Sequence, residues 1–462
     1  MTDTLKVCSP VDNSICVERP YASNADINAC LSSSMVAQNQ WQQTSIDQRK
    51  AVCLRAVEYM LENQQILAEE ISWQMGRPLR YTPGEINGFT ERVRAMVDIA
   101  KQKLQPIAVQ NDGSFTRYIE RAPLGIVFSI TPWNYPYLTA VNSIIPAIMA
   151  GNSVIMKPSS QTPLTAERIG EALEQAGLPK DVFQYLFLDH EATKKVITSN
   201  QVNYISFTGS VSGGRMIEQA AAGHFIDVGL ELGGKDPAYV RSDANLDFAV
   251  ENLVDGVYFN SGQSCCGIER IYVHQDIYDN FVERFIELVN QYKLGNPLDN
   301  DTTLGPMVSS TAADRVRNQI KDAINKGAKA CIDTAKFPAD QQSGPYLAPQ
   351  LLVNVDHSME IMSEETFGPV AGIMKVDSDE QAIQLMNDSQ YGLTASVWTQ
   401  DQDAAIAIGN QVNTGTCFMN RCDYLDPELA WTGVKHSGKG CTLSEVGYEK
   451  LTRPKSFHLR RV

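Results

Sequence analysis

The sequence predicts an α/β protein built on parallel sheets, and two observations carry this prediction. From about residue 114 onward, short β-rich runs alternate with helix-like segments, a pattern typical of βαβ units. Several of these runs end in polar residues, and ligands of parallel sheets bind beyond the carboxyl ends of the strands. A chain of 462 residues is also too long for one ordinary core, so we expect two or three domains.

The elements can be assigned in order. Before residue 105 the chain is helical in character, because apolar residues between 53 and 67 recur near a 3.6-residue period. The strands expected next are 114–120, 125–130, 153–156, 183–188, 204–207 and 226–230. A helix at 164–176 ends at Gly177. A second alternating region covers about 234–430 and contains an amphipathic helix at 277–292. The basic tail, 451–462, is either a strand that pairs with another chain or a frayed terminus.

Composition excludes several classes of protein. Hydrophobic residues make up 43% of the chain and charged residues 20%, as in soluble globular proteins. We see no apolar run long enough for a membrane span and no secretory leader, so we expect a cytoplasmic protein with no membrane partner. The net charge of −15 argues against nucleic acid. Ten cysteines without CxxC pairs, beside six histidines, predict reduced thiols and no metal site.

The richest chemical signal is a cysteine that follows a glycine-containing polar turn. Cys265 closes the segment Asn-Ser-Gly-Gln-Ser-Cys, and Glu231 opens Glu-Leu-Gly-Gly-Lys upstream. A cysteine attacks as its thiolate, and a nearby carboxylate is a candidate base. The alternative is that Cys265 is a small buried hydrophobe and Glu231 a solvated acid.

A second polar group stands at the end of a predicted strand. Asn134 lies within Pro-Trp-Asn-Tyr-Pro, where its side-chain amide is placed to donate to a developing oxyanion. Loss of such a donor typically slows a reaction roughly 100- to 1000-fold. The alternative for Asn134 is a turn with a helix cap.

A third signal is a glycine-rich turn that opens a helix. The segment from Phe207 to Gly214 resembles a strand–turn–helix phosphate site, although a plain turn explains it equally well. Lys157 ends another predicted strand and is placed to meet a phosphate or a ribose. Together these strand ends predict the place of a dinucleotide.

Six segments occur in one order along the chain: PWNYP, KPSSQTP, FTGS, LELGGK, NSGQSC and EETFGPV. Their combination resembles the aldehyde dehydrogenase superfamily over nearly the whole chain. The resemblance implies a Rossmann-type coenzyme-binding domain (1–104 and 124–233), an α/β catalytic domain (234–435) and a small oligomerisation β hairpin (105–123 and 448–462). It also implies a homodimer or a homotetramer.

The resemblance implies roles for individual residues. Cys265, rather than Cys266, is the nucleophile, Glu231 the general base and Asn134 the oxyanion donor. NAD, with NADP as an alternative, would bind at positions shared with the family, namely Trp133, Lys157, Ser160, Gly209, Ser210, Gly214, Leu232, Glu365 and Phe367.

These roles imply a reaction. The Cys265 thiolate adds to an aldehyde, hydride leaves for the nicotinamide, and Glu231 activates the water that hydrolyses the thioester. A base at Glu231 indicates a free acid as product, in contrast to relatives that pass the acyl group to coenzyme A. The rival hypotheses are a thiol esterase or acyl-transferring enzyme, and a binding protein that has lost activity.

Two departures from the family pattern affect the coenzyme and the base. Ser160 replaces the glutamate that binds adenosine ribose in NAD-preferring members, so the charge that repels a 2′-phosphate is absent. Thr442 stands where many relatives have a proton-relaying glutamate. Glu445 is an acid nearby in the sequence.

The substrate pocket is the least defined part of the prediction. Asn142 and Phe259 replace the two arginines that relatives acting on succinate semialdehyde use as a carboxylate clamp. Tyr135 and Phe259 would make the wall aromatic, and Arg421 would grip an anionic head or form an ion pair with Asp423 or Asp426. We expect a small polar or anionic aldehyde, such as succinate semialdehyde, sulfoacetaldehyde or an amino-aldehyde.

Overall fold

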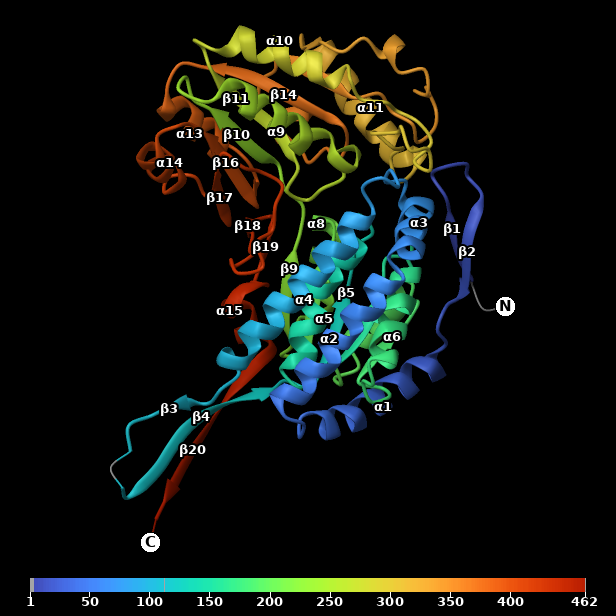
Figure 1. Cartoon of the computed structure of the whole chain (residues 1–462), viewed down its shortest axis with the longest axis vertical. Helices are drawn as coiled ribbons and strands as arrows, with labels where there is room; N and C mark the ends of the chain where they lie inside the picture. Colours follow the sequence, from blue (N-terminus) through green and yellow to red (C-terminus); the bar gives the residue numbers. More distant parts are fainter. Residues whose placement is uncertain (1–3, 112, 462) are drawn as a thin grey trace.

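A computed structural model describes residues 4–111 and 113–461. Two mixed α/β bodies, each built around its own sheet, are joined by several crossings of the chain, and a β arm projects from one of them (Figure 1). The predicted α/β fold class is confirmed. Residues 1–3, 112 and 462, which fall in the predicted coenzyme domain and oligomerisation segments, lie outside the described residues.

The first sheet has the strand order β19-β9-β8-β5-β6-β7. Its strands are β5 (Ile126–Ile130), β6 (Ser153–Lys157), β7 (Phe183–Tyr185), β8 (Tyr204–Thr208), β9 (Asp227–Glu231) and β19 (Gly438–Lys439). All neighbours run parallel except β19, which pairs antiparallel with β9. The chain leaves β5 toward β6 on one side and later returns to β8 on the other, so the sheet has a switch point beyond β5, where ligands bind in such folds.

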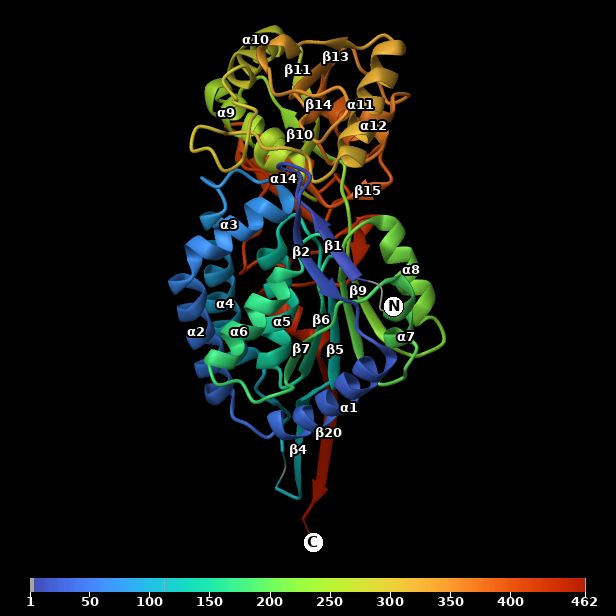
Figure 2. The same cartoon turned by 90° about the vertical axis from the view of Figure 1, so that its right-hand side faces the viewer.

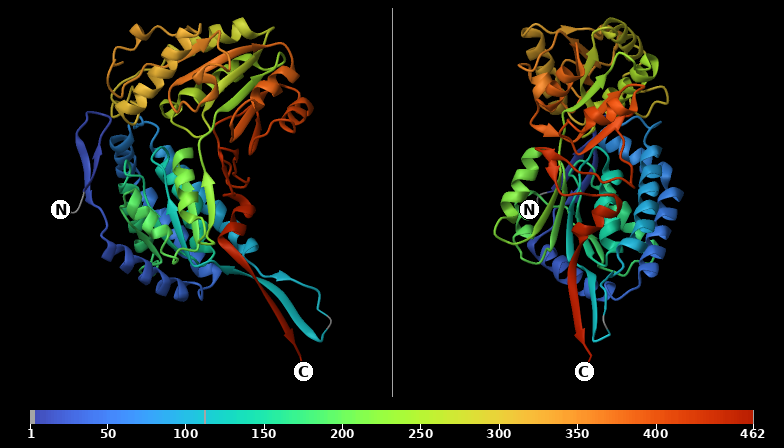
Figure 3. Two further views of the ribbon diagram at one scale, coloured as in Figure 1. Left: turned by 180° about the vertical axis from the view of Figure 1, so that it is seen from behind. Right: turned by 90° about the vertical axis from the view of Figure 1, so that its left-hand side faces the viewer.

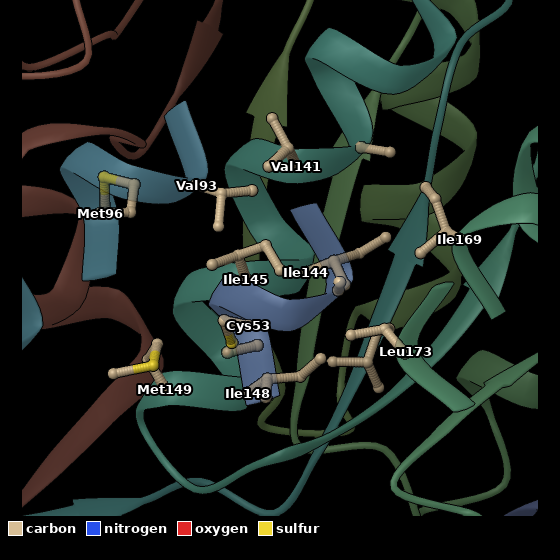
Figure 4. Packing of buried hydrophobic residues seen from close by; sticks show 14 of the residues in the cluster. Cys53, Val93, Met96, Val141, Ile144, Ile145, Ile148, Met149, Ile169 and Leu173 are labelled. Carbon is tan, nitrogen blue, oxygen red and sulfur yellow. The ribbon is translucent and has the colours of Figure 1, made fainter. Parts of the chain in front are cut away.

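Helices cover both faces of this sheet, as Figure 2 shows. The helices of one face are α2 (Ile46–Glu62), α4 (Pro83–Lys103), α5 (Pro136–Met149) and α6 (Leu164–Gln175), and those of the other are α1 (Asn24–Trp41), α7 (His190–Ile197) and α8 (Val211–Ala221). Along β5 the side chains alternate between them: Val127 belongs to the first core, and Ile126 and Phe128 to the second. In the first core, residues such as Val93, Ile145 and Leu173 from α4, α5 and α6 meet (Figure 4).

The second sheet has the order β12-β13-β14-β11-β10-β16-β17. Its strands are β10 (Asp236–Val240), β11 (Ile268–His274), β12 (Lys329–Ala330), β13 (Gln350–Val353), β14 (Val370–Val376), β16 (Thr394–Trp398) and β17 (Thr416–Met419). Only the β12–β13 pair is antiparallel among these described strands. The main helices around it are α9 (Leu246–Tyr258), α10 (Tyr278–Val289), α11 (Ser310–Asn325), α13 (Asp379–Asn387) and α14 (Gln402–Gly409) (Figure 3).

The arm is a three-stranded antiparallel sheet of β3 (Ile107–Ala108), β4 (Phe115–Pro123) and β20 (Thr452–Arg460). The basic tail is therefore a strand, and its partner is β4 of the same chain, from Thr452 beside Pro123 to Arg460 beside Phe115. The arm extends away from both bodies (Figures 1 and 3).

Some elements differ from the expectation. An N-terminal hairpin, β1 (Thr4–Cys8) with β2 (Ile15–Pro20), was not expected, and β7 is shorter than the run 183–188. The remaining elements are α3 (Gln64–Met75), α12 (Glu360–Ser363), α15 (Ser444–Gly447), β15 (Tyr391–Gly392), β18 (Val434–Lys435) and short 3₁₀ turns at Phe259–Gly262, Thr334–Lys336 and Tyr448–Leu451. Among the described residues, no helix combines the length and apolar character needed to span a membrane.

Candidate active site

The polar strand ends of the first sheet meet at one edge. Ile130, the last residue of β5, lies beside Lys157, and Thr208 lies beside Glu231. The loop after β5 carries Trp133 and Asn134 to the same edge. Parallel strands thus bring together groups that are far apart in the sequence.

The candidate nucleophile is presented by an unusual turn between α9 and β11. Asn260, Ser261 and Gly262 have φ angles of 52°, 57° and 69°, and such left-handed conformations are costly for residues with a side chain. A Cβ at Gly262 would lie 2.2 Å from the Gly368 carbonyl oxygen, so a side chain does not fit there. Ser261 Oγ anchors the turn by donating to the Gly305 carbonyl at 2.8 Å.

Asn134 contacts this turn directly. Its side chain is buried, and Nδ2 donates to the Gln263 carbonyl at 3.1 Å, two residues before Cys265. This bond uses one of the two hydrogens on Nδ2 and fixes the amide beside the loop that carries the cysteine.

The two adjacent cysteines lie in different environments. Cys265 is partly exposed, whereas Cys266 is buried and its thiol donates to Asp423 Oδ1 at 3.1 Å. Ser264 Oγ donates to the same carboxylate oxygen at 2.6 Å. The Cys265 thiol and burial raise the pKa of Cys266 well above its usual value, which keeps Cys266 protonated and leaves Cys265 as the accessible thiol.

Glu231 is held by two hydroxyl groups. Thr442 Oγ1 donates to Oε1, and Thr208 Oγ1 lies 3.4 Å from Oε2. Thr442 is itself fixed by two backbone hydrogen bonds with Trp431. Burial raises the pKa of Glu231, and the hydrogen bond from Thr442 opposes that rise. A carboxylate with a raised pKa is suited to accept a proton near neutral pH.

Cys265 and Glu231 line one cavity of about 490 Å³. Its wall also includes three predicted substrate residues, Tyr135, Asn142 and Phe259. Arg421, the fourth, is not among the lining residues: it is exposed and its guanidinium stacks 3.4 Å from the centre of the Tyr424 ring. The structure therefore does not bring Arg421 into this cavity, nor does it show an ion pair from Arg421 to a described acid.

The predicted coenzyme residues come from both bodies. The rings of Trp133 and Phe367 meet edge to face with centroids 5.6 Å apart. Glu365 Oε1 accepts from the Gly234 backbone N–H at 3.2 Å, and burial raises the pKa of Glu365 to about 7. Lys157 is partly buried, and burial lowers its pKa.

The start of α8 suits a phosphate group. Ser210 caps the helix, its Oγ accepting from the Gly213 N–H at 3.1 Å, and no acidic residue stands in the first turn. Gly209 and Gly214 place no side chain at this turn. A Cβ at Gly214 would lie only 2.8 Å from Leu232 Cδ2, so a larger residue does not fit there. Helix N-termini with free backbone space bind anions.

Ser160 is exposed beyond β6 and carries no charge. Among the described residues, no cluster of histidine, cysteine or acidic side chains suits a metal ion.

Sequence reasoning missed a buried ion pair beneath the site. Arg77 Nη1 lies 2.5 Å from Glu85 Oε2, and Glu85 Oε1 accepts from the Tyr137 N–H at 2.8 Å, at the start of α5. Arg77 also donates to the Asn134 carbonyl. The available signal was Glu85 on the buried face of a helical pattern, where an unpaired charge would not be stable.

A second missed pair lies where the chain passes from the first body into the second. Lys235, in the Glu-Leu-Gly-Gly-Lys segment, lies 2.6 Å from Glu269, and both are buried. Glu269 in turn accepts from the backbone N–H groups of Thr366 and Phe367. The pair thereby ties the loop after Glu231 to the loop that carries Glu365 and Phe367.

Comparison with known protein families finds one family model along almost the whole chain. The model described as "Aldehyde dehydrogenase family" matches residues 1–457.

Individual relatives are similar over most of their length. The NADP+ succinate-semialdehyde dehydrogenase of Deinococcus radiodurans is 33% identical over 439 residues, covering 94% of this chain and 91% of the relative. The betaine aldehyde dehydrogenase of Bacillus subtilis is 33% identical over 424 residues, covering 91% and 86%. Among solved structures, PnpE of Pseudomonas sp. WBC-3 in complex with nicotinamide adenine dinucleotide is 31% identical, with a TM-score of 0.94 over 99% of this chain and 94% of that one.

Proposed function

This chain belongs to the aldehyde dehydrogenase family, and from that premise we propose that it oxidises a small polar or anionic aldehyde to its carboxylic acid with NAD+ or NADP+. The observation that carries the proposal is the shared cavity: Cys265 and Glu231 line it together, and Asn134 is hydrogen-bonded to the loop that presents Cys265. A thiol, a carboxylate and an amide donor are the groups that acyl chemistry through a thioester requires.

In the first step the Cys265 thiolate adds to the aldehyde carbon and forms a thiohemiacetal. The charge that develops on oxygen is stabilised by the free hydrogen of Asn134 Nδ2 and by the backbone N–H of Cys265. When bound, the nicotinamide coenzyme supplies the hydride acceptor that converts this adduct to a thioester.

In the second step Glu231 removes a proton from water. The hydroxide attacks the thioester carbon, the C–S bond breaks, and the acid and the Cys265 thiolate are released. Thr442 and Thr208 orient the carboxylate for this role. The position of Glu231 in the cavity favours hydrolysis over transfer of the acyl group to another acceptor.

The coenzyme would be held by residues at the edge of the first sheet and by the loop that follows α12. Lys157 and Glu365 suit the two riboses, the α8 N-terminus with Ser210 suits the pyrophosphate, and Trp133 and Phe367 suit the nicotinamide side. NAD+ is the main coenzyme of the proposal. Ser160 carries no negative charge to repel a 2′-phosphate, so NADP+ is the alternative. One similar enzyme is named for NADP+, and one similar solved structure contains nicotinamide adenine dinucleotide.

The proposal also includes a homodimer or homotetramer in the cytoplasm. The projecting sheet of β3, β4 and β20 leaves strand edges open to another copy. The ten cysteines are all free thiols in the structure, which suits a reducing compartment.

Two substitutions test the mechanism. We expect Cys265→Ala to abolish production of reduced coenzyme from an aldehyde, with Cys266→Ala as the matched control that retains it. We expect Glu231→Gln to give a single burst of reduced coenzyme followed by a stall, because the thioester forms but is not hydrolysed. Steady turnover in Cys265→Ala would refute the assigned nucleophile, and hydrolysis of an ester with no reduced coenzyme formed from any aldehyde would indicate an esterase instead.

A further inference from the structure

A buried arginine on α4 is not used by the mechanism above. Arg92 is 7% exposed and lines the cavity that holds Cys265 and Glu231. Its Nη1 donates to the Leu138 carbonyl and, at 3.1 Å, to Asn142 Oδ1. Among the described residues Arg92 forms no ion pair, and the hydrogen bonds of its guanidinium are these two from Nη1. A buried cation without an ion-pair partner is costly unless something else neutralises it.

A second, independent observation lies beside this arginine. Asn142 is 3% exposed, and its Nδ2 is buried without a hydrogen-bond partner among the described residues. Because its Oδ1 accepts from Arg92, the Nδ2 end is directed away from that bond. A buried donor left unpaired costs about 1–3 kcal/mol, so two neighbouring groups on one wall of the cavity lack acceptors.

Arg92 contacts a position that the resemblance to the family associates with substrate binding. Asn142 stands where relatives acting on succinate semialdehyde carry an arginine of the carboxylate clamp. In this chain a cation from α4, Arg92, contacts the side chain at that position. Its charge also acts in the reaction cavity, because Glu231, Cys266 and Cys265 are among the groups that oppose the lowering of its pKa by burial.

Five acidic groups line the cavity, and the charge of Glu231 is the one that acts most strongly on Arg92, although the two form no ion pair. The other four are placed differently. Glu85 is paired with Arg77 at 2.5 Å, and Asp423 accepts from Ser264 and Cys266. Glu91 is exposed to solvent, and burial raises the pKa of Asp255 to about 6. None of these four forms an ion pair with Arg92.

The position of Asn142 on α5 fits a short substrate. The oxyanion donor Asn134 precedes α5, and Asn142 lies six residues beyond Pro136, the first residue of the helix. At 1.5 Å per residue this places Asn142 about 9 Å from Pro136 along the helix axis. Leu138, between Pro136 and Asn142, lines the cavity and provides an apolar stretch for a short carbon chain.

We propose that Arg92 and Asn142 bind the carboxylate head of a short oxo-acid whose aldehyde end reaches Cys265. The guanidinium of Arg92 and the Asn142 amide donate to the two carboxylate oxygens. The carboxylate thereby neutralises the buried charge of Arg92 and gives Asn142 Nδ2 a hydrogen-bond acceptor. This assignment rests on the proposed aldehyde oxidation and names its substrate class.

The test compares aldehydes that differ in head-group charge. The probes are succinate semialdehyde, uncharged butanal and cationic 4-aminobutanal, and the readout is kcat/KM for each from the absorbance of the reduced coenzyme. In the unmodified enzyme we expect succinate semialdehyde to be the best of the three. Arg92→Met should lower the ratio of kcat/KM for succinate semialdehyde to that for butanal about 10- to 100-fold, as expected for lost hydrogen bonds to a charged group.

Two further variants distinguish a specific effect on substrate binding from a general folding defect. Arg94→Met, on the exposed face of the same helix, is the matched control and should leave the ratio unchanged. Asn142→Leu should lower the ratio several-fold, chiefly through KM for succinate semialdehyde.

An equal loss of activity toward both aldehydes in Arg92→Met, with an unchanged ratio in Asn142→Leu, would overturn the proposal and give Arg92 a structural role. A preference of the unmodified enzyme for 4-aminobutanal would overturn it as well. Failure of the proposed function itself differs from both results, because then none of the three aldehydes yields reduced coenzyme.

Discussion

At the scale of single residues, the site is organised by hydrogen bonds that exist before any substrate binds. Asn134 is tied to the loop of Cys265, and Glu231 is tied to Thr442. The three catalytic candidates were predictable because each stands in a short motif with its own chemistry. The resemblance placed Thr442 at a position linked to the base, but the hydrogen bond from its hydroxyl to Glu231 was not predictable, since no local pattern shows which distant hydroxyl meets a buried carboxylate.

Replacing Thr442 by valine removes the hydroxyl that donates to Glu231 and keeps the side-chain volume. That bond stabilises the ionised carboxylate, and a bond to a charged group contributes about 1.5–3 kcal/mol, so its loss should raise the pKa of Glu231 further. The base works when ionised, so activity rises with pH through this pKa and the acidic limb of the kcat profile moves to higher pH. Thr442→Ser keeps the hydroxyl, and coincident limbs in the two variants would contradict the argument.

At the scale of elements, the contact between α4 and α5 shapes the cavity. Apolar periodicity predicts the helices, but it does not reveal that α4 turns charged residues toward the site. Glu85 receives the first N–H groups of α5 and pairs with Arg77, which also reaches the Asn134 carbonyl. The start of α5 and the oxyanion donor therefore share one buried support.

Glu85→Gln tests this support. The substitution leaves Arg77 buried and unpaired, and breaking a buried pair in this way typically costs about 3–5 kcal/mol. We expect a lower midpoint of urea unfolding and a reduced kcat, because Asn134 loses its fixed position. The control is Glu62→Gln, an exposed acid at the end of α2, and equal unfolding midpoints in the two variants would rule out the role given to the pair.

At the scale of the whole molecule, the two bodies supply different parts of one site. The first sheet provides Asn134 and Glu231, and the second body provides the loop with Glu365 and Phe367. Alternating strands and helices predict parallel sheets, and the strand-like character of the tail predicts β20. Strand order follows from contacts between distant segments, which explains why the pairing of β19 with β9 and the N-terminal hairpin were not anticipated.

Lys455→Pro tests the arm. Lys455 follows Pro454 in β20 and lies beside Glu120 of β4. A second proline removes a further backbone N–H from this strand and should weaken the arm. We expect light scattering to show a dimer or tetramer for the unmodified protein and a smaller species for the variant, whereas Lys455→Ala should keep the full mass. An unchanged molar mass of Lys455→Pro in light scattering would show that assembly does not depend on this arm.

The pairing of β19 with β9 has a consequence for biosynthesis. Glu231, the proposed base, ends a strand whose neighbour, Gly438–Lys439, is translated late, and Thr442 follows that neighbour. Cys265 is therefore synthesised well before the residues that hold the carboxylate of Glu231. A prematurely terminated chain that ends before residue 438 contains Cys265 but lacks the strand beside Glu231 and the hydroxyl of Thr442.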